Sequence, residues 1–222
     1  MSQAVFLDAM FYRLRNPGPW RDLPTCYGHW RTIYGWYRLH ARSGLWLRML
    51  KTFTKKRQRL VVLVDGTHVL AHPSAARIGN ASQQAMGKTR GGRNTKIMAL
   101  TDAQGRLVSF KLIEGQGYEG AHVIDLLPEG QTCLVVGDKG FDSDKLRAEL
   151  EALGHNHCFP GKRNRKVKII YNKKRYRERY KVENFFCRLK SWASANLRRD
   201  KLALHFSSMI AFAAVIDWMR QN

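Results

Sequence analysis

The sequence has no long apolar run, few cysteines and few acidic residues, and each shortage excludes a class of protein. The longest unbroken apolar run, Met209–Ile216, is far shorter than the roughly 20 residues that a membrane-spanning helix needs. The first 20 residues mix charged with apolar side chains, which excludes a secretory signal. The 4 cysteines are widely scattered and form no CxxC pair, so neither a zinc site nor a disulfide framework is expected, and a reducing cytoplasm is the predicted location.

The shortage of acidic residues says most about the partner of the chain. Its 222 residues include 39 Lys and Arg but only 17 Asp and Glu, which gives a net charge of +22. Because 44% of the residues are hydrophobic, the chain can build a core, and wholesale disorder is excluded. So large an excess of positive charge predicts a polyanionic partner, and nucleic acid is the expected one.

The charge is unevenly distributed along the chain. Residues 1–59 carry a net charge of +10, residues 60–161 carry −1, and residues 162–201 carry +13. A near-neutral centre with most of the carboxylates is therefore flanked by two cationic segments. This layout is expected if the flanks hold phosphate groups while the centre performs a different task.

Residues 1–59 are predicted to form a small helical DNA-binding domain that ends in a basic linker. Helices are expected over Val5–Leu14, Tyr27–Ala41 and Leu45–Phe53, because apolar side chains recur there at helical spacing between Pro and Gly stops. Two helices joined by a tight glycine turn, with Arg31 and Arg38 on the outside, are typical of a helix-turn-helix module that contacts DNA. A generic helical dimerisation domain is the alternative.

Residues 60–222 are predicted to form an α/β domain around a mixed sheet. The pattern predicts a buried strand over 60–64, a hairpin of 95–102 with 106–113, and further strands over 133–136 and 155–159. Helices are expected over 142–153, where Asp142 and Asp144 would act as caps, over 174–197 and over 203–219. Meandering strands followed by alternating helices and strands favour one mixed sheet flanked by helices.

Two aspartates follow predicted buried strands and are expected to lie near each other. Asp65 comes directly after the first strand, and Asp138 comes after the strand that ends at Val136. The ends of neighbouring strands in such folds form the edge of a site. Two carboxylates at short range repel unless a cation neutralises them, so a divalent metal is the simplest explanation. Each aspartate alone could equally cap a turn.

A third carboxylate, Glu183, lies on the predicted helix 174–197 within a narrow stripe of polar residues. Tyr176, Arg179, Glu183 and Lys190 are separated by 3, 4 and 7 residues, which places them within about 60° of one helical face. Ordinary salt bridging within a solvated helix is the alternative. Residues 162–201 have 16 basic and 3 acidic side chains, so most of these cations need an anion from elsewhere, and phosphate would supply it.

These residues together resemble a known family. The order Asp65, Asp138, Glu183, with the Tyr-(2)-Arg-(3)-Glu-(6)-Lys signature that ends at Lys190, is similar to a DDE transposase. The phrases GPWRDLP (18–24), VDGTHV (64–69), RGGRNTK (90–96) and GDKGFDSD (137–144) resemble the IS-five family of bacterial insertion sequences. The resemblance covers nearly the whole chain, although many relatives carry a further N-terminal stretch before the first helix.

The resemblance implies an RNase H-like catalytic fold and a set of partners. Asp65, Asp138 and Glu183 would be catalytic and would hold Mg²⁺ or Mn²⁺, with two ions expected. The 45 residues from Asp138 to Glu183 leave no room for the extra β-domain of some relatives. Tyr176, Arg179 and Lys190 would contact double-stranded DNA at the terminal inverted repeats. Target DNA, a homodimer on DNA and a nucleoid-associated position in the cytoplasm are also expected.

The segment 66–94 is predicted to be a long loop in which Lys88, Arg90 and Arg93 touch DNA; a flexible surface loop is the alternative. Two other functions compete with transposition. One is a catalytically inactive DNA-binding regulator or remnant that occupies transposon ends. The other is a structure-selective nuclease of the same fold, which would cut without preferring an inverted repeat.

Overall fold

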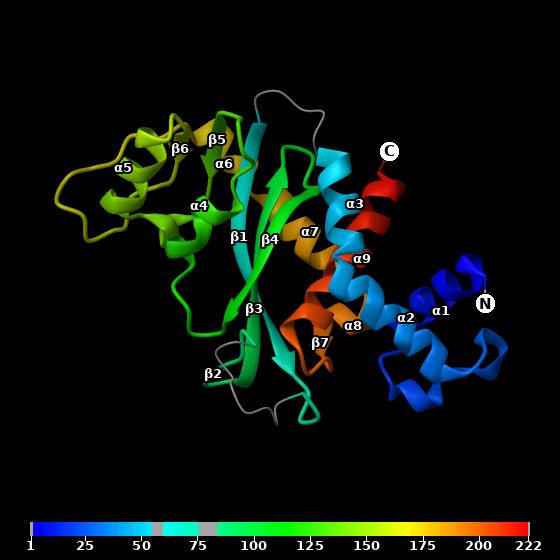
Figure 1. The fold of residues 1–222 in the computed structure, drawn as a ribbon. Helices are drawn as coiled ribbons and strands as arrows, with labels where there is room; N and C mark the ends of the chain where they lie inside the picture. The colour runs from blue at the N-terminus through cyan, green and yellow to red at the C-terminus, as the bar shows by residue number, and fades with distance from the viewer. Residues whose placement is uncertain (1, 55–59, 76–83, 222) are drawn as a thin grey trace.

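The computed structural model describes residues 2–54, 60–75 and 84–221, which form one mixed β-sheet between two sets of helices (Figure 1). The helices are α1 Gln3–Arg15, α2 Trp30–Ser43, α3 Leu45–Thr54, α4 Val123–Leu126, α5 Asp144–Ala152, α6 Lys173–Arg177, α7 Tyr180–Lys190, α8 Ala193–Asn196 and α9 Ala203–Arg220. The strands are β1 Leu60–Ala71, β2 Gly87–Thr89, β3 Gly92–Asp102, β4 Leu107–Glu114, β5 Cys133–Val136, β6 Asn156–Cys158 and β7 Leu197–Arg198.

The sheet combines an antiparallel meander with parallel strands. β1 pairs with β3 and β3 with β4, both antiparallel, while β5 runs parallel to β1 and β6 runs parallel to β5. The short β7 pairs with the far end of β1, where Leu70 meets Leu197. The chain thus forms a three-stranded meander and then adds parallel strands on the other side of β1. This is the mixed sheet flanked by helices that the sequence predicted.

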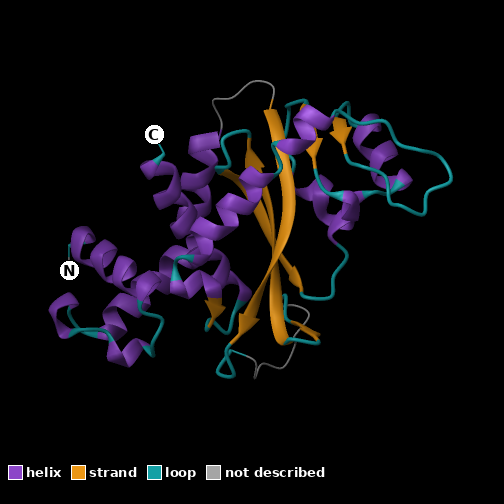
Figure 2. Ribbon diagram, turned by 180° about the vertical axis from the view of Figure 1, so that it is seen from behind, coloured by secondary structure: helices purple, strands orange, loops and turns teal. Residues whose placement is uncertain are grey.

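Alternate residues of β1 pack into two separate cores. Val62 and Val64 belong to the core under α4 and α5, whereas Leu63 and Val69 belong to the core under α7 and α9. This alternation follows from the two-residue period of a strand. Figure 2 shows the sheet from behind, with helices on both of its faces. Asp65 has the parity of Leu63, so its side chain is directed toward the α7 face.

The helices of residues 2–54 pack onto the C-terminal helix and share its core. Phe6, Met10, Ile33 and Trp46 are buried in the same hydrophobic cluster as the apolar face of α9. The turn between α2 and α3 is formed by Gly44 at φ 65°, a left-handed conformation that favours glycine. Residues 55–59 of the predicted linker lie outside the described residues, while 51–54 are the end of α3. In the described part of the chain no helix is long and apolar enough to cross a membrane.

Three predicted boundaries were wrong. β1 does not end at Val64 but continues to Ala71, because Gly66–Leu70 pair with Asn94–Met98 of β3. Much of the predicted loop 66–94 is therefore strand, although 76–83 lie outside the described residues. The predicted helix 174–197 is divided into α6, α7 and α8. Bonds from each N–H to the carbonyl three residues earlier, as from Val182 to Arg179, tighten the chain between α6 and α7.

Candidate active site

Asp65 and Asp138 occupy matching positions on neighbouring parallel strands. Leu63 pairs with Val136, and each aspartate lies two residues further along the chain, Asp65 within β1 and Asp138 just beyond the end of β5. Adjacent strands are about 4.8 Å apart, and residues two apart share a face, so both carboxylates lie on the α7 side of the sheet. Asp65 lies inside β1 rather than beyond its end. Asp138 directs its Oδ1 to the N–H of Gly140 at 2.7 Å, as the cap of the 3₁₀ turn Lys139–Phe141.

Arg179 links the first carboxylate to the third. Its Nη1 donates to Asp65 Oδ2 at 3.2 Å, and its Nη2 donates to Glu183 Oε1 at 2.6 Å. The tight turn before α7 places the guanidinium between the two acids, which are 118 residues apart in the sequence. The side chains of Arg179 and Asp65 are about one-fifth exposed, and that of Glu183 is half exposed. Asp65 of β1 and Glu183 of α7 therefore share one cation, and Asp138, which follows β5, is close enough for its negative charge to raise the pKa of Asp65.

The surroundings of Asp65 disfavour its charged form. Burial raises the pKa of Asp65 to about 6, and the nearby negative charges of Asp138 and Glu119 act in the same direction. The Gly66 N–H, which donates to Asp65 Oδ1 at 2.8 Å, and the Arg179 guanidinium lower the pKa but do not outweigh burial. A carboxylate in this environment gains from a further positive charge. The edge is thus prepared electrostatically for a cation.

The oxygen donors suit a hard divalent ion, but their present arrangement is closed by Arg179. Asp65, Asp138 and Glu183 offer only carboxylate oxygens, the ligands that Mg²⁺ and Mn²⁺ prefer. Within the described residues no three acidic, His or Cys groups are already close enough to hold a metal ion. The guanidinium occupies the place of positive charge between Asp65 and Glu183, so it stands in for a cation. The donor chemistry of the three acids suits such an ion, whereas their present spacing does not hold one.

Tyr176 and Lys190 lie on either side of these acids along the same helical segment. The ring of Tyr176 meets that of Tyr171 edge-on, with centroids 5.4 Å apart. Lys190 ends α7, two helical turns or about 10 Å beyond Glu183. It is half-buried, and burial lowers its pKa. The predicted stripe is thus distributed over α6, the turn and α7.

The other predicted DNA-contact residues lie away from the three acids. Arg31 and Arg38 are exposed on α2, where they cover the rings of Trp30 and Tyr34. Lys88, Arg90 and Arg93 are exposed around the β2–β3 turn, at the end of the sheet where Asn94 pairs with Leu70. Leu70 is five residues, or about 17 Å of strand, beyond Asp65. The structure brings none of these five cations to the acidic edge.

Sequence reasoning missed an ion pair behind Asp65. Lys96 Nζ lies 2.9 Å from Glu119 Oε1 and donates to the carbonyl of Gly117, also at 2.9 Å. A Cβ on Gly66 would lie 2.8 Å from the Glu119 carboxyl carbon, so a larger residue at this position would displace the Glu119 carboxylate. The pair lies on the sheet face opposite to the Asp65 side chain, and its acid raises the pKa of Asp65. The glycine after Asp65 was the only signal in the sequence.

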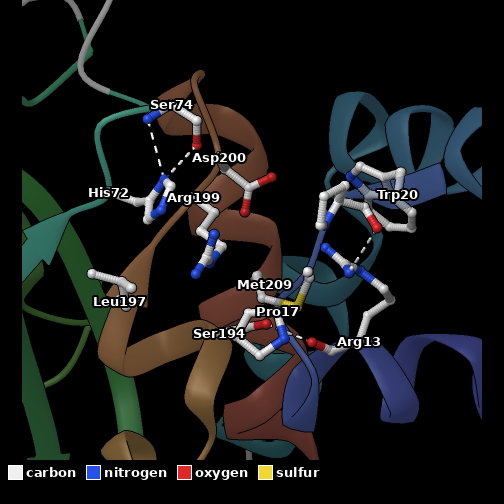
Figure 3. Close-up of a pocket in the computed structure, with 12 residues that line it drawn as sticks. Arg13, Pro17, Trp20, His72, Ser74, Ser194, Leu197, Arg199, Asp200 and Met209 are labelled. Carbon is white, nitrogen blue, oxygen red and sulfur yellow. Dashed lines mark hydrogen bonds between the residues drawn. The ribbon is translucent and has the colours of Figure 1, made fainter. Parts of the chain in front are cut away.

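A separate polar cavity of about 260 Å³ joins the N-terminal helices to the sheet (Figure 3). The start of the GPWRDLP motif forms one wall, and Arg13, Arg199, Asp200 and His72 line the space. Tyr37 donates to Asp200 Oδ1 at 3.2 Å, and burial raises the pKa of Asp200 to about 6. Ser194 donates from its hydroxyl to the carbonyl of Arg13, which ties α8 to α1. Trp20 of this motif packs against the rings of Tyr34 and Tyr37, so the motif helps to hold α2 in place.

Two family models match the sequence of this chain. A family model described as "Transposase DDE domain" matches residues 56–216, and one described as a transposase of the IS4/5 family matches residues 2–50. The uncharacterized protein y4sN of Sinorhizobium fredii is 33% identical over 72 residues, which are 32% of this chain and 58% of that protein.

One solved structure supports the RNase H-like fold. A cryo-EM structure of the piggyBac transposase synaptic complex with hairpin DNA is similar to 78% of this chain, with a TM-score of 0.51 and 10% identity. The Mos1 transposase paired-end complex with the left transposon end covers 88% of this chain and 79% of its own, with 11% identity and a TM-score of only 0.29. This chain spans 49% of the piggyBac chain. Since the matching DDE model covers well over half of its residues, the chain belongs to the family of DDE transposases.

Proposed function

We propose that this chain cleaves DNA at the ends of an insertion sequence and joins those ends to target DNA. The observation that supports the proposal is that Arg179 joins Asp65 to Glu183 across 118 residues, while the charge of Asp138 raises the pKa of Asp65. A purely structural ion pair does not need a second aspartate beside a largely buried one, because like charges at short range cost stability. A reaction that uses a cation explains it.

The three carboxylates would hold Mg²⁺ or Mn²⁺, in our proposal two ions. When bound, divalent ions in such a site activate an attacking oxygen and stabilise the leaving oxygen of an in-line phosphoryl displacement. The residues of the chain determine where this happens. Asp65 is fixed by the Gly66 N–H and directs its other oxygen to Arg179, while Asp138 is fixed by the Gly140 N–H.

Cationic side chains would hold the DNA at this edge. Arg179, once its carboxylates are engaged elsewhere, has a planar fork of donors that suits a phosphate. Lys190 has a lowered pKa from burial, so an arriving phosphate would restore its preference for the charged form. Tyr176 would support the backbone beside Arg179. These groups position the strand and steady its charge rather than transfer protons.

The remaining exposed cations would bind DNA further from the cut. We propose that residues 1–59 form the DNA-binding domain, with Arg31 and Arg38 on its outer face, and that Lys88, Arg90 and Arg93 contact the same duplex at the β2–β3 turn. A transposon has two ends and each needs an active site, so a homodimer on DNA is proposed. A DNA substrate of this kind would place the chain at the nucleoid, in the cytoplasm.

A donor-plasmid assay tests the proposal. A supercoiled plasmid that carries the gene with its chromosomal flanks is incubated with the protein and Mg²⁺. We expect nicking at the flanking repeats, lost in Asp138→Asn while DNA binding persists, and retained in the control Asp144→Asn, whose side chain is 81% exposed. Equal nicking by wild type and Asp138→Asn would refute the assignment. Binding without any nicking would favour the regulator, and nicking without preference for the repeats would favour the structure-selective nuclease.

A further inference from the structure

The segment between β6 and α6 combines the densest positive charge with the most exposed apolar side chain among the described residues. Residues 162–174 contain 7 Lys and Arg and no Asp or Glu. Within this segment the Ile170 side chain is 97% exposed and that of Val167 is 72% exposed. Figure 1 shows the segment as a long loop that runs out beyond α5 and returns to α6.

The first half of this loop is fixed to the turn that follows Asp138. Arg165 donates from Nε to Asp142 Oδ2 at 2.7 Å and from Nη2 to Asp144 Oδ1 at 2.5 Å. The Lys162 N–H donates to the same Asp142 oxygen at 2.7 Å. Asp142 is only 1% exposed, so this anchor is buried and well defined. The loop therefore begins from a fixed point four residues beyond a catalytic carboxylate.

The second half is fixed to the segment that carries Arg179. The Tyr171 ring packs edge-on against Tyr176, and Asn172 caps α6 by accepting from the Arg175 N–H at 3.0 Å. Ile169 is directed inward, since a Cβ on Gly161 would lie 3.2 Å from its Cγ1. Ile170, between the inward Ile169 and the packed Tyr171, is therefore held outward by its two neighbours.

We propose that residues 162–172 form a DNA wedge, in which Ile170 is inserted between bases beside the phosphate to be cut while Lys166 and Lys168 hold the flanking phosphates. This inference rests on the proposed function. An exposed apolar side chain in a segment rich in Lys and Arg matches DNA, which offers apolar base faces behind a negatively charged backbone. Separation of the terminal bases would free the strand to reach the carboxylates. Residues 162–172 contain 5 Lys and Arg and no acid, and of these Arg165 pairs with Asp142 and Asp144.

Permanganate oxidation of unstacked thymines tests the wedge. The probe is the linear fragment that carries the gene and its flanks, bound by full-length Asp138→Asn protein so that no cutting occurs. We expect oxidised thymines next to the cleavage position. Adding Ile170→Ser should reduce their reactivity at least fivefold and change DNA affinity less than twofold. The double variant Lys166→Ala, Lys168→Ala should instead flatten the dependence of binding on salt by about two units of slope.

A cleavage experiment separates a wedge from a merely structural role. Ile170→Ser in the active protein should nick fully paired ends about tenfold more slowly, and ends made with mismatched terminal pairs should restore the rate. Leu202→Ser, at a 40% exposed leucine outside the loop, serves as the control and should leave both readouts unchanged. Unchanged permanganate reactivity in Ile170→Ser, or no rescue by mismatches, would overturn the wedge. The proposed function fails separately, if Asp138→Asn nicks as wild type does.

Discussion

Asp142 offers a sharp test of the electrostatics around the site. Its carboxylate is 1% exposed and accepts hydrogen bonds from Arg147, Arg165 and the Lys162 N–H. Asp142→Ala would leave the Arg147 guanidinium, whose side chain is 9% exposed, without its anion. Removing one partner of a buried ion pair costs about 3–5 kcal/mol. Arg147 keeps its bond to the Phe159 carbonyl, so we expect a loss near ~3 kcal/mol, the lower end of that range.

Thermal unfolding measured by circular dichroism at pH 7 gives the readout. For a chain of this size, ~3 kcal/mol corresponds to a Tm lowered by about 6–12 °C. Asp144→Ala is the matched control, because this neighbouring carboxylate also pairs with Arg165 but is 81% exposed. An exposed pair contributes about 1 kcal/mol or less, so its Tm should fall by less than about 4 °C. Equal shifts in the two variants would refute the reasoning.

Acid should abolish the difference between wild type and Asp142→Ala. Burial alone would raise the pKa of Asp142, but hydrogen bonds from Arg165, the Lys162 N–H and Arg147 outweigh burial and hold the pKa well below its usual range. A depressed carboxyl pKa stabilises the folded state at all pH values above the unfolded pKa of about 4. This contribution is lost as pH falls further. A Tm difference that stays constant down to pH 2 would contradict this account.

Three further predictions concern the hairpin, the acidic edge and the basic helix. Gly105→Ala should have a lower urea midpoint of unfolding than Gly130→Ala. Both glycines have positive φ, but only at Gly105 would the new Cβ lie 2.7 Å from a backbone carbonyl oxygen. Equal urea midpoints for the two variants would contradict this prediction. In EDTA, Asp65→Asn should be more stable than wild type by up to about 3 kcal/mol at pH 8 and equally stable at pH 4. The reason is that a carboxyl group with a raised pKa loses folding free energy as the pH rises toward about 6 and the group ionises. No gain in stability at pH 8 would exclude a buried charge at Asp65. Lys190→Ala should lower the salt slope of DNA binding by about one unit, and an unchanged slope would remove Lys190 from the interface.

The sequence predicted those helices and strands whose own apolar pattern is enough to identify them. The hairpin of β3 and β4 and the strand β5 occur where apolar runs end at Gly or Asp, β6 occurs just before Pro160-Gly161, and α9 contains the longest apolar run of the chain. Asp138 lies where expected, because Gly137 ends β5 directly before it. The family and the RNase H-like fold were also predicted, from motifs that persist along nearly the whole chain.

Features that depend on distant contacts could not be predicted. The second half of β1 contains Gly66 and His68, a weak strand pattern, and it is extended only because β3 pairs with it. The break before α7 depends on local i→i−3 bonding that periodicity does not detect. Asp142 was predicted to cap α5, but Ser143 is the cap and Asp142 is an ion-pair centre, which requires Arg165 to fold back 23 residues later.

The core shared by α1–α3 and α9 has a consequence for evolution and for engineering. Twelve of the 18 residues of α9 are buried, in the same core as Met10, Ile33 and Trp46. A fragment lacking the first 54 residues would expose the apolar surface of α9 to water and would aggregate rather than fold to the native state. DNA specificity could therefore not be transferred between transposases by exchanging residues 1–54 alone. The exchange would also need compensating substitutions along α9.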